Sequence, residues 1–260
     1  MPHLSILQTG GLSLLIFLAG FVDSIAGGGG IISLPAYFAA GLPAHMALGT
    51  NKFSSFVGTF TAVFRYHKAN LVNWRVGLWA AAGSLAGAAL GARLALLVPA
   101  PVIQTVLIVL VPMVLVFLLL KDRLLPASSA APGSAIPRLS AKSLIIGAVI
   151  GTYDGFFGPG TGTFLAIAFY SILNLNLVEA SADARLANLA SNAGALAVFM
   201  WNGQVAFPLA LVTGASGIAG NFLGSRLALQ KGERIIKPLM TVVLVLLLLE
   251  VIRRRLAAGV

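Results

Sequence analysis

The amino-acid sequence predicts an all-α polytopic membrane protein made of two inverted repeats, each with a glycine-broken first segment followed by three transmembrane helices. The chain is 58% hydrophobic and only 9% charged, with a mean hydropathy of +0.97. A soluble domain carries about 25% charged residues, so this composition indicates membrane helices. The two halves of the chain also resemble each other, and their equivalent loops carry opposite charge patterns.

Apolar runs of helix length follow one another along the chain, and most reach the roughly 20 residues that a membrane crossing requires. They cover residues 4–26, 44–66, 76–98, 102–120, 144–157, 178–200, 206–229 and 235–252. Between them, residues 121–142 include the tract PASSAAPGSAIPR, which is typical of a flexible linker. We therefore expect a first transmembrane repeat over 1–120, a cytoplasmic linker over 121–142 and a second repeat over 143–260.

The first run of each half is interrupted by glycines. It divides into residues 12–26 and 31–40 in the first half, and into 144–157 and 163–173 in the second. Pieces of about 10 to 15 residues form helices only about 15 to 22 Å long, which is short for a membrane crossing. We expect pairs of half-helices that meet near the middle of the membrane, either re-entrant or strongly broken.

An internal repeat relates the two halves. GAALGARLA (87–95) aligns with GNFLGSRLA (220–228) at an offset of 133, and Asp23 aligns with Asp154 at an offset of 131. The loop RYHKANLVNWR (65–75) is basic, whereas its counterpart WNGQVAF (201–207) is uncharged. Conversely, VPAP (98–101) is neutral where QKGERIIK (230–237) is basic. Because basic loops stay in the cytoplasm, equivalent loops prefer opposite sides, which indicates inversion.

The basic tail at Arg253, Arg254 and Arg255 favours a rival arrangement. With inverted repeats this tail would lie outside the cell, whereas eight spans in parallel repeats would keep the carboxyl terminus inside. The inverted arrangement accounts for the charges of four loops. The side of the membrane on which the carboxyl terminus lies is left open.

Several classes of function are disfavoured by composition. The chain has no cysteine, and its three histidines have no ligand spacing, so we expect no metal site and no cofactor. The net charge of +10 comes from Lys and Arg between apolar runs, which indicates membrane topology and no nucleic-acid partner. No acid–base pair or activated nucleophile has a usable spacing, so we do not expect an enzyme. The first Lys or Arg is Lys52, so a cleaved secretory signal is not expected.

The glycine-rich turns are candidate anion sites. Glycine turns and helix N-termini offer free backbone N–H groups and partial positive charge. The predicted residues are Gly27, Gly28, Gly29, Gly30, Gly158, Gly160, Thr161 and Gly162. The alternative is that these glycines only allow close helix packing, the role that we assign to Gly83, Gly87 and Gly91.

A second candidate cluster lies on the next helix of each half. Lys52, Ser55 and Thr59 share one helix face, and Arg185, Asn188 and Asn192 have the same spacing 133 residues later. A cation deep in the membrane costs about 2.5 to 3.5 kcal/mol and is a functional-site hypothesis by default. The alternative is internal ion pairing, of Lys52 with Asp23 and of Arg185 with Asp154 or Asp183.

Asp23 and Asp154 are the remaining acids inside the predicted membrane segments. Either could carry a proton during transport, or each could accept hydrogen bonds from its own glycine turn and support that loop.

Four motifs resemble the TauE/SafE sulfite exporter family, also called the toluene sulfonate uptake permease family. They are DSIAGGGG (23–30), LGTNKFSS (48–55), DGFFGPGTG (154–162) and ARLANLASN (184–192), and the resemblance covers nearly the whole chain. It implies secondary transport of sulfite, sulfoacetate or another organosulfonate across a bacterial inner membrane. It also implies that Asn51 joins the glycine turns and the two cations around the substrate.

These observations predict a multi-pass carrier that works by alternating access, with coupling to protons. The expected partners are a small sulfur-containing anion and the lipid bilayer, and a homodimer is left open. A passive anion channel is the main alternative, followed by a cation or metal transporter that uses Asp23 and Asp154.

Overall fold

The computed structural model describes residues 5–103 and 139–231 and, between these ranges, residues 105, 106, 109, 110, 113, 114 and 116. The predicted runs at 102–120 and 235–252 lie mostly or wholly outside this part of the chain, as do most of the linker and the basic tail. The regular elements within it are all α-helical. Those with defined bounds are α1 (Ile6–Ala26), α2 (Gly29–Ala39), α3 (Ala44–Lys68), α4 (Trp74–Leu97), α6 (Leu139–Phe156), α7 (Thr161–Ile172), α8 (Leu177–Trp201) and α9 (Phe207–Lys231).

Polar caps set where several helices begin. Ser5 and Gln8 form a capping box at the start of α1, with Gln8 N donating to Ser5 Oγ over 3.2 Å and Ser5 N donating to Gln8 Oε1 over 2.9 Å. Asn176 caps α8 by accepting from the amide of Glu179. α6 begins at Leu139, so the last residues of the predicted linker are helical.

The glycine breaks occur where the sequence predicts them. α1 ends before Gly27 and α2 begins at Gly29, while α6 and α7 are separated by residues 157–160. α2 folds back along α1, since Ile32 packs with Val22 near the break and Tyr37 packs with Ile16 farther away. α1 has 21 residues, longer than the predicted piece of 12–26, because the capping box starts it upstream.

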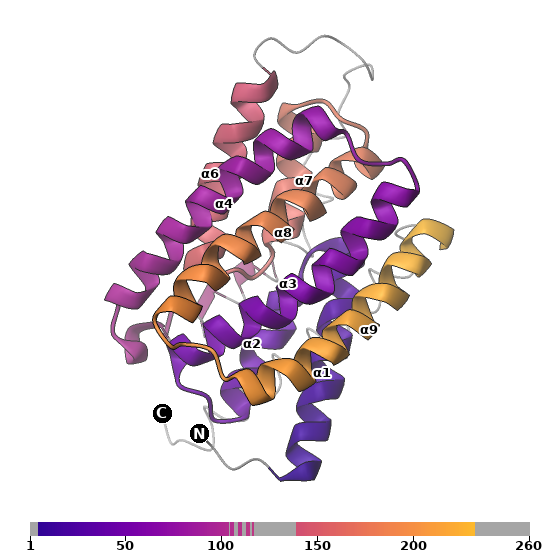
Figure 1. Cartoon of the computed structure of the whole chain (residues 1–260). Coiled ribbons are helices and arrows are strands. Elements are labelled where there is room, and N and C mark those ends of the chain that lie inside the picture. Colours follow the sequence, from indigo (N-terminus) through magenta and orange to yellow (C-terminus); the bar gives the residue numbers. More distant parts are fainter. Residues whose placement is uncertain are drawn as a thin grey trace.

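The two halves pack closely along two equivalent seams. Figure 1 shows α4 beside α6, and α1 beside α9. A Cβ atom at Gly83, Gly87 or Gly91 of α4 would collide with backbone carbonyls of α6, so the two backbones touch. The predicted packing role of these three glycines is confirmed. Gly220 and Gly224 of α9 lie equally close to the backbone of α1.

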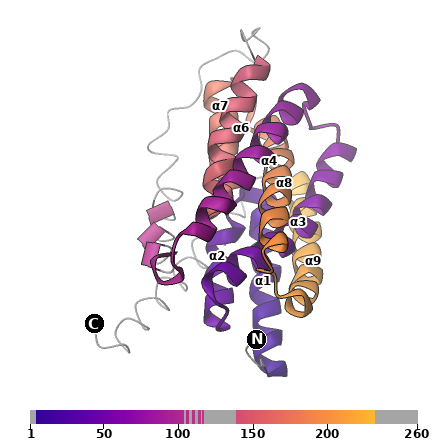
Figure 2. The same cartoon turned by 60° about the vertical axis from the view of Figure 1, so that its left-hand side comes forward.

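The equivalent helices α3 and α8 cross the centre in opposite directions. Gly49, near the start of α3, lies against Phe199 near the end of α8. Tyr66, near the end of α3, clusters with Ala182 near the start of α8. The remaining packing is reciprocal, because α4 lies along α8 as α9 lies along α3 (Figure 2).

The outer helices suit a bilayer. α1, α4 and α9 are each long and apolar enough to cross a membrane. They expose large apolar side chains such as Trp79, Leu90 and Leu211. α3 and α8 instead carry buried charged residues, Lys52 on α3 and Asp183 and Arg185 on α8. The apolar shell therefore surrounds a polar centre.

Candidate functional site

The two glycine breaks meet at the centre of the molecule. Thr163 N donates to Gly27 O over 3.3 Å. Gly27 has a φ of +79°, and a Cβ atom there would collide with the backbone of Gly162. Gly30 also approaches the backbone of Pro159, less closely. Only glycine combines this left-handed conformation with so close an approach, so Gly27 holds the beginnings of α2 and α7 against each other.

Backbone N–H groups are free at this meeting point. The N-cap positions of α2 and α7 are Gly28 and Gly160, and neither provides a side-chain cap. Within the described residues, the amides of Gly30 and Gly162 donate no hydrogen bond. Two helix N-termini therefore present unpaired donors and partial positive charge to the same small region.

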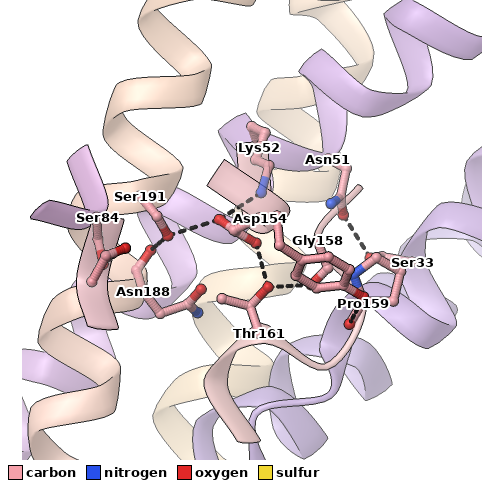
Figure 3. A network of polar contacts seen from close by, with 12 residues as sticks. Ser33, Asn51, Lys52, Ser84, Asp154, Gly158, Pro159, Thr161, Asn188 and Ser191 are labelled. Carbon is pink, nitrogen blue, oxygen red and sulfur yellow. Dashed lines mark hydrogen bonds and ion pairs between the residues drawn. The ribbon is translucent and has the colours of Figure 1, made fainter. Parts of the chain in front are cut away.

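Asp154 is the centre of a polar network that joins the two halves. Its Oδ2 atom lies 2.7 Å from Lys52 Nζ, and both side chains are at most 3% exposed. Thr161 donates to Asp154 Oδ1 over 2.8 Å, and Ser191 donates to Oδ2 over 2.7 Å. Figure 3 shows these three donors, from α3, α7 and α8, converging on one carboxylate of α6.

The ion pairs expected as the alternative at these positions are wrong. Lys52 pairs with Asp154 and not with Asp23, and Arg185 has no carboxylate within 4.0 Å among the described residues. The physical reason is the antiparallel crossing of α3 and α8, which brings Lys52 to the acid of the other half.

Arg185 is a buried cation without a direct counter-charge in the described structure. Its side chain is 1% exposed, and its Nε and Nη1 atoms have no hydrogen-bond partner there. Its Nη1 atom lies against Gly162, beside one of the free amides, and Lys52 Nζ lies beside Gly158. Because an unpaired buried charge is costly, this arrangement favours binding of an anion at Arg185.

Asp23 has a different environment from Asp154. Its Oδ1 atom accepts from the amide of Gly29 over 3.1 Å, which is the hydrogen bond that loop support requires. Asp23 is within electrostatic range of Arg185 and Lys52 but forms no ion pair in the described part of the chain.

The other predicted residues divide between the network and its surroundings. Asn51 is buried and accepts from Ser33 Oγ of α2 over 2.5 Å. Asn188 and Asn192 are buried on α8, and Asn188 points toward Thr161 in Figure 3. Ser55 lies outside the network and lines a small cavity beside Asp23. No group of three or more His, Cys, Asp or Glu residues that could hold a metal lies together in the described ranges.

Sequence reasoning missed Ser33, Ser191 and Asn221, which belong to the same polar interior. A signal existed for Ser191, because it lies one helical turn after Asn188, inside the run ARLANLASN (184–192). Ser33 and Asn221 stand alone in apolar runs and carry no such signal.

Comparison with known proteins gives the family. The profile described as Sulfite exporter TauE/SafE matches residues 12–251. Probable membrane transporter protein ORF9 of Sinorhizobium sp is 38% identical over 236 residues, which cover 91% of this chain and 89% of that protein. Probable membrane transporter protein YfcA of Escherichia coli strain K12 is 36% identical over 237 residues, covering 91% of this chain and 87% of YfcA.

A more distant relative is probable membrane transporter protein YdhB of Bacillus subtilis strain 168, 21% identical over 215 residues. These residues cover 82% of this chain and 87% of YdhB. No solved structure matches the chain significantly. With its apolar outer helices, its glycine breaks and a family match over nearly its whole length, this chain belongs to the TauE/SafE sulfite exporter family and is a membrane transporter.

Proposed function

We propose that this transporter is a secondary carrier that moves a small sulfur-containing oxyanion, such as sulfite, sulfoacetate or another organosulfonate, across the bacterial inner membrane. The observation that carries the proposal is Arg185, which is buried, has no counter-charge within 4.0 Å in the described part of the chain, and lies at the meeting point of two helix N-termini.

The chemistry of the donors fits such an anion. A sulfite or sulfonate group has three oxygens in a pyramidal arrangement and accepts several hydrogen bonds at once. Arg185 presents Nε and Nη1 without partners, and hydrogen bonds from a charged guanidinium to an oxyanion are among the strong ones. The free amide of Gly162 lies beside it. Lys52 would add a second positive charge if the anion displaces it from Asp154.

Alternating access would follow from inverted repeats. The proposal takes residues 1–120 and 143–260 as the repeats, joined by a cytoplasmic linker, in a multi-pass arrangement. It is supported by the antiparallel crossing of α3 and α8 and by the reciprocal packing of α1 with α9 and of α4 with α6. One repeat would rock against the other about the central site. The driving force would be a cation gradient, for which the sequence favours protons.

A binding experiment tests the site. We expect sulfite or a sulfonate to give a calorimetric signal with purified wild-type protein, and Arg185→Gln to weaken binding by about 10- to 100-fold, because hydrogen bonds to a charged group contribute about 1.5 to 3 kcal/mol. The matched control is Arg93→Gln, which makes the same change at an exposed position of α4. Unchanged affinity in Arg185→Gln would refute the assignment.

Transport measurements then separate carrier from channel. A carrier gives saturable uptake into proteoliposomes, abolished by a protonophore if protons drive it. Unitary conductance steps in a planar bilayer would instead identify a channel.

A further inference from the structure

A small cavity lies beside Asp23, outside the network around Asp154. It is formed between α1, α2, α3 and α9 and has a volume of about 20 Å³, enough for one water molecule or one small ion. Five polar side chains line it, namely Asp23, Ser33, Ser54, Ser55 and Asn221. None of them is a cation, so the lining offers oxygen ligands around a single carboxylate.

The acid beside the cavity lacks hydroxyl donors that its counterpart in the other half has. Asp154 accepts from Thr161 and Ser191 and pairs with Lys52. The positions equivalent to Thr161 and Ser191, at offsets of 131 and 133, are Gly30 and Gly58. Asp23 therefore lacks both hydroxyl donors. In the described structure it keeps one hydrogen bond, from Gly29 N.

Asn221 supplies an oxygen that has no partner. Its Nδ2 atom donates to Gly217 O over 3.0 Å, and because a carbonyl can only accept, this bond fixes the orientation of the amide. The Oδ1 atom is buried without a hydrogen-bond partner in the described structure, on a residue that is 2% exposed. A buried acceptor of this kind is costly unless something donates to it or coordinates it.

Two of the three serine hydroxyl groups around the cavity have donor protons engaged elsewhere. Ser33 donates to Asn51 Oδ1 or Gly29 O, and Ser54 lies within donating distance of Thr50 O and Asn51 O. Ser54 Oγ also shares a hydrogen bond of 2.9 Å with Tyr37 Oη, and each of the two serines keeps at least one oxygen lone pair for a ligand. The cavity lies between the last two turns of α1, where the helix dipole carries partial negative charge, and Gly29 at the start of α2, whose amide already donates to Asp23. Lining oxygens, one carboxylate and a helix C-terminus all favour a hard monovalent cation.

We propose that this cavity binds Na⁺, with Asp23 as the charged ligand and Asn221 Oδ1, Ser33, Ser54 and Ser55 as neutral ligands. Binding of the ion stands on the cavity alone, whereas its use as the coupling ion rests on the proposed anion transport. An anion at Arg185 would neutralise a cation that acts on Asp23, and Na⁺ would then balance that carboxylate. Na⁺ would replace the proton that the sequence alone favours.

Thermal unfolding of the purified protein tests the site without any substrate. We expect NaCl to raise the Tm of the wild type with the logarithm of its concentration, and choline chloride at equal strength to leave Tm unchanged. Asp23→Asn and Asn221→Ala should each lose the Na⁺-dependent shift. The control is Asp183→Asn, because Asp183 is also a buried acid of the polar interior but does not line the cavity.

Arg185→Gln separates this inference from the anion site. We expect it to keep the Na⁺ shift and to lose the response to sulfite, whereas Asp23→Asn should lose the Na⁺ shift. Equal shifts with Na⁺ and choline, or a full Na⁺ shift in both Asp23→Asn and Asn221→Ala, would overturn the Na⁺ site. If the control variant Arg93→Gln also lost the sulfite response, that result would contradict only the assignment of the anion site to Arg185.

Discussion

At the residue scale, we expect the ion pair between Lys52 and Asp154 to contribute to both stability and function. Each is buried, so removal of either partner leaves an uncompensated charge. We expect Lys52→Ala to lower the free energy of unfolding by about 3 to 5 kcal/mol. The double variant Lys52→Met, Asp154→Leu should recover most of that loss, because Thr161 and Ser191 retain the carbonyls of Gly158 and Asn188 as acceptors.

Chemical denaturation of the single and double variants in detergent measures this difference, and anion binding by the double variant should remain weak despite its recovered stability. A double variant as unstable as Lys52→Ala would mean that the charge pair itself is not the source of the loss.

Gly27 is the position at which contact between the two glycine breaks requires a left-handed backbone conformation. Gly27→Ala places a side chain in a left-handed conformation, at a cost of about 1 to 2 kcal/mol, and drives its methyl group into Gly162. We expect a lower Tm and loss of anion binding. The control is Gly10→Ala, an exposed position inside α1 with nothing within 4 Å, which should stabilise the protein by about 0.5 to 1 kcal/mol. Full anion binding by Gly27→Ala would argue against the central site.

At the element scale, the seam between α4 and α6 depends on backbone contact. Gly87→Val inserts a branched side chain against the carbonyl of Ala148, and we expect a loss of about 1 to 3 kcal/mol or more from overpacking. Ala86→Val on the exposed side of the same turn should change stability by less than about 0.5 kcal/mol. Scanning calorimetry of both variants checks the difference, and equal Tm values would show that the seam tolerates separation.

The helices also show how much of the fold could be predicted from the sequence. Apolar runs predicted most described helix ends within a few residues, because lipid and buried cores both select continuous apolar surface. The glycine runs predicted both helix breaks, because glycine disfavours the helical conformation and allows two backbones to touch. The partner of Lys52 could not be predicted, since it depends on how α3 crosses α8, which no local pattern encodes. The different surroundings of Asp23 and Asp154 were likewise not predicted, because they depend on Gly30 and Gly58 occupying the positions equivalent to Thr161 and Ser191.

At the scale of the whole molecule, the proposed inverted topology makes a prediction about two loops. α3 and α8 run antiparallel, so the residues that follow them lie at opposite ends. The chain has no cysteine, so an introduced one is the single labelling site. We expect Asn202→Cys to react with a membrane-impermeant maleimide in spheroplasts, and Ala69→Cys, in the basic loop, to react only after lysis. Labelling of both from outside would exclude inverted repeats.

The ion pair between the halves also bears on how the protein is made. Lys52 belongs to the half that is synthesised first, whereas its partner Asp154 lies beyond the region that joins the halves. During synthesis the first half would therefore enter the bilayer with an unmatched ammonium group, at a cost of about 2.5 to 3.5 kcal/mol. This cost would be removed only when the second half inserts and Asp154 pairs with Lys52. Neither half should persist alone in the membrane, and quality-control proteases should remove a chain truncated at the linker.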